Sequence, residues 1–220
     1  MLVGTATMRA LAETRVLLVG TGGVGSWCAE ALVRTGVGHF TLVDADRVCA
    51  SNVNRQLMAT SKTIGEPKVE ALARRLREIN PAAAIAAIAG IYSADTSTTF
   101  KLEEHDFVID AIDSVADKAH LIRHALSFPS VTLFSSMGAA RKFDLFRIRT
   151  SEFWKVQGDG LARALRNRFR KSGEFPCRKF TCVWSDEPPR TEGGTVMHVT
   201  AAFGLALASL VVRAVCAKTR

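Results

Sequence analysis

The sequence lacks the paired cysteines of a structural zinc site. Its five cysteines, an odd number, are scattered, and four residues separate Cys177 from Cys182 with no second pair to complete a CxxC…CxxC pattern. No signal-peptide pattern precedes them. We therefore expect free thiols in a reducing compartment and a cytoplasmic protein.

A long uninterrupted apolar run is also missing. In VMHVTAAFGLALASLVVRAV (196–215), His198 and Arg213 bracket an apolar stretch shorter than the roughly 18 residues of a membrane span. We expect a buried C-terminal helix and no membrane span. The chain has no repeat, low-complexity tract or evident linker, which predicts a single domain over 1–220.

Acidic residues are in the minority. Lys and Arg number 29 against 21 Asp and Glu, a formal charge of +8. This balance permits a polyanionic partner such as nucleic acid, although a solvated surface explains it equally well. The excess is concentrated in a predicted amphipathic helix, GLARALRNRFRKSG (Gly160–Gly173). Its basic residues are predicted to form a stripe that serves either as a phosphate-contacting surface or as a solvated helix face; they are Arg163, Arg166, Arg168, Arg170 and Lys171.

Short apolar segments alternate with segments of helical spacing. Strands are predicted at 15–20, 39–44, 85–90, 106–112 and 131–136, and helices at 24–36, 66–81 and 115–128. Such alternation predicts an α/β fold with a Rossmann-like, doubly wound, mainly parallel sheet covered on both faces. We assign 15–138 to the nucleotide-binding core. The remaining 139–220 form a C-terminal strand and helix elaboration, with one or two strands in 140–154 and another at 179–184, expected to serve substrate binding and dimerisation.

A glycine-rich loop follows the first predicted strand. Gly20, Gly22 and Gly25 form G-x-G-x-x-G at the start of a helix, whose free N–H groups and dipole favour phosphate. Asp44 ends the next strand, where it can accept hydrogen bonds from ribose hydroxyls. These features fit NAD and ATP equally.

The residues beyond the loop distinguish the two nucleotides. Asn52, Arg55 and Lys68 supply an amide and two cations, which suit phosphoryl and acyl-adenylate chemistry and have no counterpart in hydride transfer. Either cation taken alone fits a solvated surface position equally well.

Two carboxylates, Asp110 and Asp113, end the fourth strand at the edge where such sheets bind ligands. A carboxylate there suits Mg²⁺. Alternatively, Asp113 or Ser114 caps the following helix.

Several motifs in this order resemble the adenylating superfamily of ubiquitin-activating enzymes and bacterial sulfur-carrier adenylyltransferases (the ThiF/MoeB/HesA type). They are GTGGVGS, LVDADRVCASNVNRQ, GEPKVE, REINP and DAIDS. Further segments resemble its tRNA threonylcarbamoyladenosine dehydratase branch, namely AIDSVADKAHLI, SSMGAARKFD, GLARALRNRFRKSG, VWSDEPP and GTVMHVTAAFGLALASLVV.

The resemblance implies a role for each matching residue. Gly20, Gly22, Gly23 and Gly25 would form the ATP loop. Asp44 would bind the ribose, and Asn52 and Arg55 the phosphates. Lys68 would bind the α-phosphate, and Asp113 the Mg²⁺, with Asp46 and Gln56 also in the motif. Arg55, Lys68 and Asp113 would be the catalytic residues.

The implied reaction is ATP-dependent adenylation of the threonine-derived carboxylate of threonylcarbamoyladenosine in tRNA, followed by intramolecular attack and net loss of water. No enzyme nucleophile is needed, so we expect Cys182 to be a packed thiol. The implied cofactors are ATP and Mg²⁺, and a monovalent cation is an optional third. The implied partners are tRNA, a second copy in a homodimer and a sulfur-transfer protein.

Two departures from the family pattern bear on these expectations. The first predicted strand begins about 14 residues from Met1, and Arg9 is the one candidate before Arg15 for the arginine that relatives extend to the neighbouring subunit's ATP. The missing CxxC pairs point away from sulfur-carrier activation. Activation of a sulfur-carrier or ubiquitin-like protein nevertheless stays an alternative, as do an NAD-dependent oxidoreductase and a non-catalytic nucleotide-binding scaffold.

Overall fold

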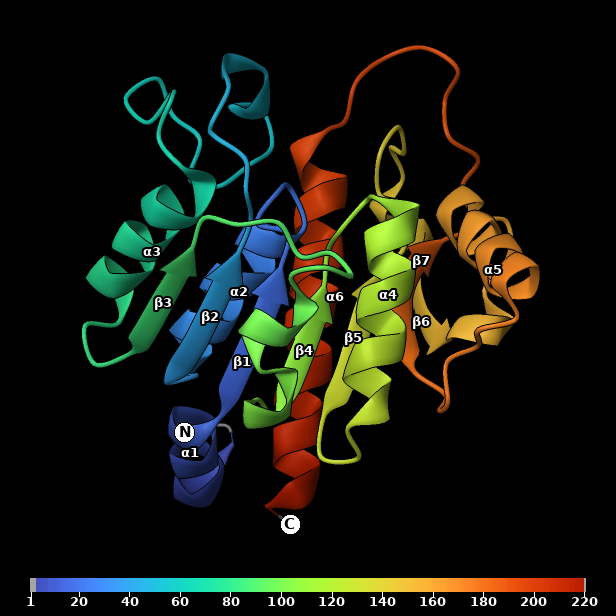
Figure 1. Ribbon diagram of the computed structural model, residues 1–220. Coiled ribbons are helices and arrows are strands. Elements are labelled where there is room, and N and C mark those ends of the chain that lie inside the picture. Colours follow the sequence, from blue (N-terminus) through green and yellow to red (C-terminus); the bar gives the residue numbers. More distant parts are fainter. Residues whose placement is uncertain (1–2, 220) are drawn as a thin grey trace.

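A seven-stranded sheet runs through the computed structural model, which describes residues 3–219 (Figure 1). Its strand order is β3-β2-β1-β4-β5-β7-β6, and all neighbours are parallel except the β6–β7 pair. The strands are β1 (Arg15–Val19), β2 (His39–Val43), β3 (Ala84–Ile88), β4 (Phe107–Asp110), β5 (Thr132–Ser136), β6 (Ile148–Glu152) and β7 (Thr181–Ser185). The doubly wound α/β fold predicted from the sequence is confirmed.

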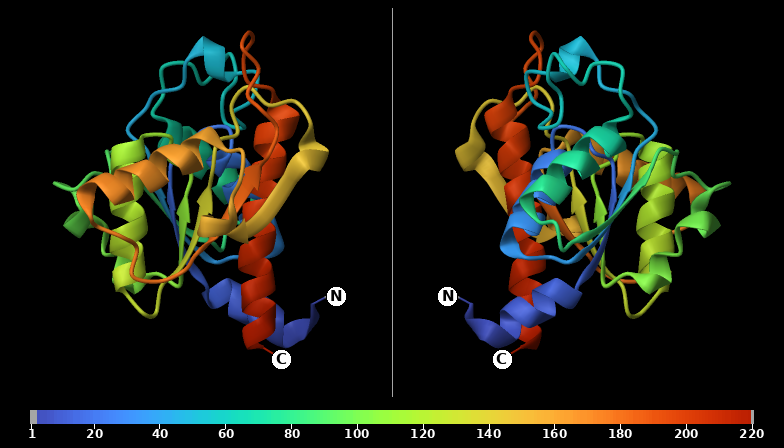
Figure 2. Two further views of the ribbon diagram at one scale, coloured as in Figure 1. Left: turned by 90° about the vertical axis from the view of Figure 1, so that its right-hand side faces the viewer. Right: turned by 90° about the vertical axis from the view of Figure 1, so that its left-hand side faces the viewer.

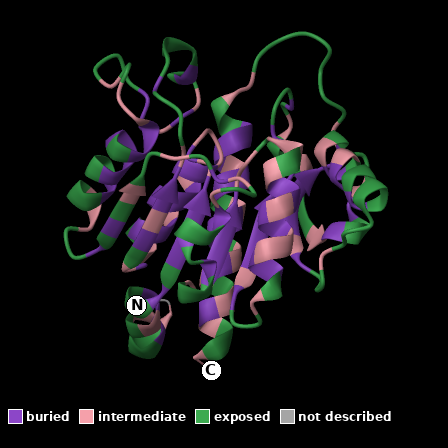
Figure 3. Ribbon diagram, viewed as in Figure 1, coloured by how far each residue is buried: buried purple, intermediate pink, exposed green. Residues whose placement is uncertain are grey.

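Alternating side chains give the sheet two apolar faces. In β1, Val16 and Leu18 join the core under α2 (Gly25–Thr35), α3 (Lys68–Ile79) and α6 (Met197–Lys218). Leu17 and Val19 point to the other face, under α4 (Val115–Ser127) and α5 (Gly160–Ser172). Figure 2 shows these two helical layers on opposite sides of the sheet, and Figure 3 shows that the central strands β1, β4 and β5 are largely buried, whereas the edge strand β3 is mostly exposed or half-buried.

The boundaries of three helices follow local signals in the sequence. α2 ends at Gly36, which adopts the left-handed conformation (φ 103°) that glycine tolerates. Pro67 directly precedes α3. The Asp159 carboxylate caps α5 by accepting a hydrogen bond from the Ala162 N–H at 2.9 Å.

The C-terminal helix α6 spans 22 residues and, by length and composition alone, could cross a membrane. The sequence prediction counted only the uninterrupted apolar residues and therefore underestimated the length of this apolar helix. Its position is nevertheless the expected one, because half of its most apolar window is buried and it packs against α2. At Gly204 the helices approach so closely that a Cβ atom would lie 2.4 Å from the Val24 carbonyl oxygen.

One feature of the fold was not predicted: an additional helix, α1 (Gly4–Glu13), precedes β1, and Leu11 anchors it in the core. The region 140–154, predicted to hold one or two strands, forms one strand, β6, which pairs antiparallel with β7 at the edge of the sheet. Short 3-10 helices connect the elements at 50–52, 97–100, 102–104, 145–147 and 153–155.

Candidate nucleotide site

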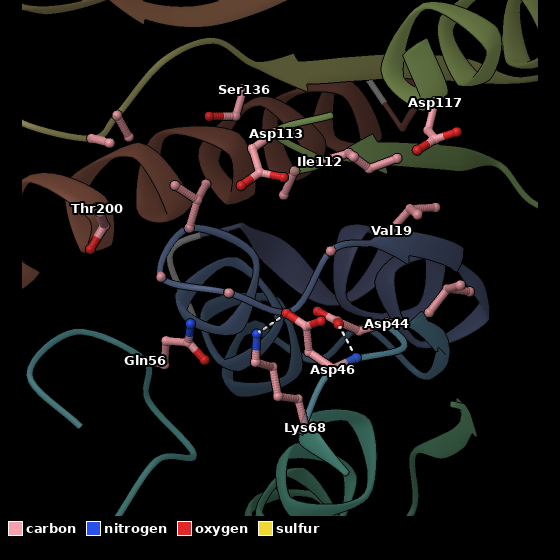
Figure 4. Close-up of a pocket in the computed structure, with 18 of the residues that line it drawn as sticks. Val19, Asp44, Asp46, Gln56, Lys68, Ile112, Asp113, Asp117, Ser136 and Thr200 are labelled. Atoms are coloured by element: carbon pink, nitrogen blue, oxygen red, sulfur yellow. Dashed lines mark hydrogen bonds and ion pairs between the residues drawn. The ribbon is translucent and has the colours of Figure 1, made fainter. Parts of the chain in front are cut away.

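A cavity of about 580 Å³ opens at the carboxyl ends of β1 and β4 (Figure 4). The chain order reverses between these two strands, because β2 and β3 lie on one side of β1 whereas β5 follows β4 on the other. Open parallel sheets bind ligands at such a switch point. The glycine loop and the polar residues singled out from the sequence converge here.

The glycine loop connects β1 to α2 along the cavity wall. Gly20 has φ 92°, and a Cβ atom there would lie 2.6 Å from the Ala111 carbonyl oxygen. At Gly25 a Cβ atom would lie 1.9 Å from the Gly20 carbonyl oxygen. The fold therefore requires both glycines. Gly22 and Gly23 lie between them and line the cavity directly.

Asp44 follows β2 and lines the cavity, as the sequence predicts. Its Oδ2 accepts hydrogen bonds from the Thr21 N–H at 2.7 Å and the Thr21 hydroxyl at 2.9 Å, and its Oδ1 accepts from the Asp46 N–H at 2.9 Å. These bonds tie the end of β2 to the glycine loop and fix the direction of the carboxylate.

Lys68 is the first residue of α3, and its buried side chain reaches the cavity wall. Its Nζ lies 2.5 Å from Oδ2 of Asp46, whose own side chain is 69% exposed. The Lys68 N–H also donates to the Asp46 carbonyl at 2.9 Å. In Figure 4 the glycine loop lies between this ion pair and Asp113. The ammonium is thus held in place beside the space that a phosphate would enter.

Three further predicted residues come from the turn at 50–57 and line the cavity: Asn52, Arg55 and Gln56. The Asn52 side chain accepts from the Cys49 N–H at 3.1 Å and shapes the turn. Arg55 donates from one guanidinium nitrogen to the Ser51 carbonyl at 2.8 Å. Within residues 3–219, the buried Gln56 Oε1 has no hydrogen-bond partner. A buried polar atom without a partner is costly, which fits a ligand at this position.

The two carboxylates at the end of β4 lie in different environments. Asp110 is fully buried, where it pairs with Lys118 at 2.9 Å and accepts from the Ser135 hydroxyl at 2.6 Å. Asp113 is exposed at the cavity and makes no hydrogen bond or ion pair with the described residues.

Of the two residues proposed to cap the following helix, Ser114 occupies the N-cap position of α4. Its hydroxyl donates to Asp117 at 2.8 Å and makes no cap hydrogen bond to the backbone, and Asp113 does not cap the helix. Asp113 is therefore free to meet a ligand.

No group of three or more His, Cys, Asp or Glu side chains within residues 3–219 is arranged to hold a metal ion. Asp113 is a single carboxylate, which is too few ligands to hold Mg²⁺ alone. It suits Mg²⁺ that is bound together with a nucleotide, because such an ion takes one or two carboxylates plus phosphate oxygens and waters.

A buried ion pair that was not predicted from the sequence supports the opposite side of the cavity. Lys142 Nζ lies 3.1 Å from Asp159 Oδ2 and donates to the Ser185 carbonyl at 2.7 Å. Asp159 also accepts from the Gly138 N–H at 3.2 Å. Gly138 lines the cavity, so this pair fixes the loop after β5. Each residue looks ordinary in sequence, because seventeen positions separate the partners.

The basic residues of α5 do not form one continuous stripe. Arg163, Arg168, Arg170 and Lys171 are exposed, but they spread over a broad face of the helix. Arg166 donates to the Val156 carbonyl at 2.8 Å and lies over the Phe153 ring, 5.8 Å from its centroid. Its guanidinium is therefore used mainly for contacts within the protein.

Cys182 is fully buried in β7. Burial raises the pKa of its thiol well above the usual range, and nearby Lys118 opposes this only in part. The thiol therefore stays protonated at neutral pH, which agrees with the expected packed role.

Comparison with known proteins identifies the family of the chain. The ThiF family model matches residues 1–220. A tRNA threonylcarbamoyladenosine dehydratase of Bacillus subtilis is 39% identical, over 85% of this chain and 72% of that protein. One from Haemophilus influenzae is 34% identical, over 92% and 85%.

Solved structures extend the comparison to the nucleotide. The Escherichia coli tRNA N6-threonylcarbamoyladenosine dehydratase in complex with ATP matches with a TM-score of 0.91 and 34% identity, over 99% of this chain and 91% of that one. Its complex with AMP matches with a TM-score of 0.92 and 35% identity, over 99% and 92%. The chain belongs to the ThiF family, and within it to the group of the tRNA threonylcarbamoyladenosine dehydratases.

Proposed function

We propose that this protein uses ATP to adenylate the carboxylate of threonylcarbamoyladenosine in tRNA and then cyclises it. The carboxylate oxygen attacks the α-phosphorus of ATP, forming an acyl-adenylate and releasing pyrophosphate. A nucleophile within the same substrate then attacks the acyl carbon, and AMP leaves. The net change in the substrate is the loss of one water.

The observation that carries this proposal is the set of groups around the glycine loop. Lys68 and Arg55 are cations that suit phosphates, and Asp113 is an uncommitted carboxylate. The buried Gln56 oxygen, which has no partner in the described chain, can accept from a hydroxyl or amino group of the nucleotide. These groups suit a nucleoside triphosphate, whose α-phosphate gains charge during adenylation. The E. coli relative has been solved in complex with ATP and with AMP, the substrate and the leaving group of such a reaction.

Each residue has a task in this scheme. Gly22 and Gly23 allow the phosphates to approach the backbone, whereas Gly20 and Gly25 allow the tight turn that shapes the loop. Asp44 accepts from the ribose, and Lys68, positioned by Asp46, stabilises charge at the α-phosphate. Asn52, Arg55 and Gln56 donate to the β- and γ-phosphates through their side-chain N–H groups. Asp113 would hold Mg²⁺, which supplies further charge neutralisation on the phosphates. A monovalent cation stays an additional prediction.

The substrate side of the cavity is lined by apolar and small residues after β5 and by the start of α5. We assign the tRNA-borne carboxylate to this side, opposite the glycine loop. The exposed cations of α5 (Arg163, Arg168, Arg170 and Lys171) would then face the tRNA backbone, with Arg166 mainly bracing the helix. A tRNA substrate also implies the cytoplasm.

We further propose a homodimer. The outward surface of α6 exposes Leu205 (52%), and Phe146 beside the start of β6 is 90% exposed. Large exposed apolar side chains commonly mark interfaces. Light scattering at micromolar concentration should give twice the chain mass, and Leu205→Glu should give monomer; a monomeric wild type would refute the dimer. We also predict a sulfur-transfer partner protein, which co-purification would detect.

ATP–pyrophosphate exchange tests the reaction class. Exchange should depend on tRNA carrying threonylcarbamoyladenosine and should be absent with tRNA lacking it. Exchange driven instead by a small protein ending in Gly-Gly would favour the sulfur-carrier alternative. Thermal protection by NADH but not by ATP with Mg²⁺ would contradict adenylation altogether.

A further inference from the structure

A second cavity of about 410 Å³ lies between α4 and α5, next to the nucleotide cavity. Asp117, in the first turn of α4, lines both cavities. On α5, Leu161 lines the first cavity and Arg168, seven residues later on the same helical face, lines the second. The two helices therefore lead from the nucleotide cavity into an adjoining groove.

The groove contains one cation that the protein does not neutralise. Arg123 pairs with Glu174 at 2.7 Å. Arg168, exposed in the groove, makes no ion pair or hydrogen bond within residues 3–219. A guanidinium without an acidic partner in a groove is well suited to bind a phosphate, because its N–H groups match the phosphate oxygens.

The wall between the cavities is held by a cluster of rings. The buried Tyr92 hydroxyl lies 2.7 Å from His124 Nδ1 and 3.4 Å from His120 Nδ1. Tyr92 lines the first cavity and His120 the second. Burial lowers the pKa of His124, and His120 lowers it further, so this imidazole is neutral at pH 7. The cluster gives the groove a defined shape.

We propose that this groove binds the ribose–phosphate unit of the tRNA adjoining the modified nucleoside. The inference rests on the proposed function, because it assumes that the modified nucleoside enters the first cavity. A nucleotide bonded to that nucleoside must lie at the cavity mouth, where Asp117 borders both spaces. Arg168 then contacts the phosphate. The Asp117 carboxylate accepts from the ribose 2′-hydroxyl, a group that distinguishes RNA from DNA.

Arg168→Ala and Lys179→Ala form a matched pair. Both remove an exposed cation, but only Arg168 lines the groove, whereas Lys179 lies before β7 at the edge of the sheet opposite the nucleotide cavity. With tRNA carrying threonylcarbamoyladenosine, Arg168→Ala should raise the KM for tRNA roughly 10-fold, as for loss of one charge-assisted hydrogen bond. The KM for ATP should not change. Lys179→Ala should change the KM for tRNA less than about 3-fold, because a distant surface charge is screened by salt.

Ser172→Trp tests the groove without altering charge. Ser172 is exposed in the last turn of α5 and lines the groove, so a large ring there blocks it while the fold is kept. The variant should weaken tRNA binding as Arg168→Ala does. Equal effects of Arg168→Ala and Lys179→Ala on the KM for tRNA, or unchanged tRNA binding by Ser172→Trp, would overturn the proposal.

The same assays separate the groove from the reaction. Absence of cyclised product with the wild-type protein contradicts the proposed function. Normal tRNA KM with Arg168→Ala contradicts the groove alone. Equilibrium binding of the same tRNA, measured for all four proteins, tests the groove whether or not product forms.

Discussion

The Lys68 ammonium lies 2.5 Å from the Asp46 carboxylate, with the lysine side chain 7% exposed and the aspartate 69% exposed. The pair joins a buried cation at the cavity wall to an anion that remains largely in water. A phosphate entering the cavity can therefore meet a cation whose position is already set, so little reorganisation is needed as charge develops.

Lys68→Ala should lower kcat at least 100-fold while changing ATP affinity only a few-fold. The reason is that Lys68 is placed on charge that grows in the transition state. Steady-state kinetics and ATP titration measure the two effects. Asp46→Asn should lower kcat less than Lys68→Ala does, because the Lys68 ammonium remains. An unchanged kcat with a raised KM for ATP would contradict the assigned role.

Asp113→Asn should shift the Mg²⁺ dependence of the reaction to higher concentration and lower the rate at fixed Mg²⁺ by roughly 100-fold. An amide oxygen is a weaker ligand than a carboxylate for this hard cation. Rates measured over a Mg²⁺ titration provide the check. Asp117→Asn, at the mouth of the same cavity, is the control and should leave the Mg²⁺ dependence unchanged. Identical Mg²⁺ curves for Asp113→Asn and the wild type would contradict the metal assignment.

Lys118→Met should destabilise the fold by about 3–5 kcal/mol, because it leaves Asp110 charged and fully buried. Urea unfolding measures the change. The double variant Lys118→Met/Asp110→Asn should lose less unfolding free energy than the single variant, because it has no unpaired buried charge. A single variant as stable as the wild type would show that the pair contributes nothing.

Glu30→Gln should destabilise the protein at pH 7 but not at acidic pH. Burial raises the pKa of Glu30, but hydrogen bonds from Arg75 and Arg34 outweigh it and hold the pKa below the ordinary value of 4.5. The ionised form is therefore favoured in the folded state. Its contribution is present above pH 4.5 and is lost as the pH falls through the lowered pKa.

The expected loss for Glu30→Gln at neutral pH is about 1–3 kcal/mol. Glu66→Gln is the matched control, because Glu66 pairs with Arg74 at the surface and should contribute less than about 1 kcal/mol. Urea unfolding at several pH values checks both variants. A Glu30→Gln effect that stays constant with pH would contradict the charge-based explanation.

Local signals in the sequence predicted the nucleotide half of the site well. The glycine turns, Pro67 before α3 and Gly36 after α2 each act through backbone conformation within a few residues, so their effect is visible in the chain itself. The motif residues from Asp44 to Lys68 consequently meet at one cavity. The helix α1 was not predicted, because no capping residue or clear start signal marks it.

The supporting contacts could not be predicted because they join distant segments. Lys142 and Asp159 meet only when the loop after β5 reaches the start of α5, and Asp110 meets Lys118 beneath the cavity. Similarly, the spacing of basic residues in α5 did not reveal that Arg166 packs on Phe153. Side-chain pairing of this kind depends on tertiary structure, which composition and periodicity do not encode.

Mass spectrometry of tRNA nucleosides tests the central claim most directly. Nucleosides from cells with and without this protein are compared under mild conditions that preserve the cyclic product. Cells with the protein should contain cyclised threonylcarbamoyladenosine, one water lighter, and cells without it should contain only the open form. The same cyclic nucleoside at the same level in both would contradict the proposed activity.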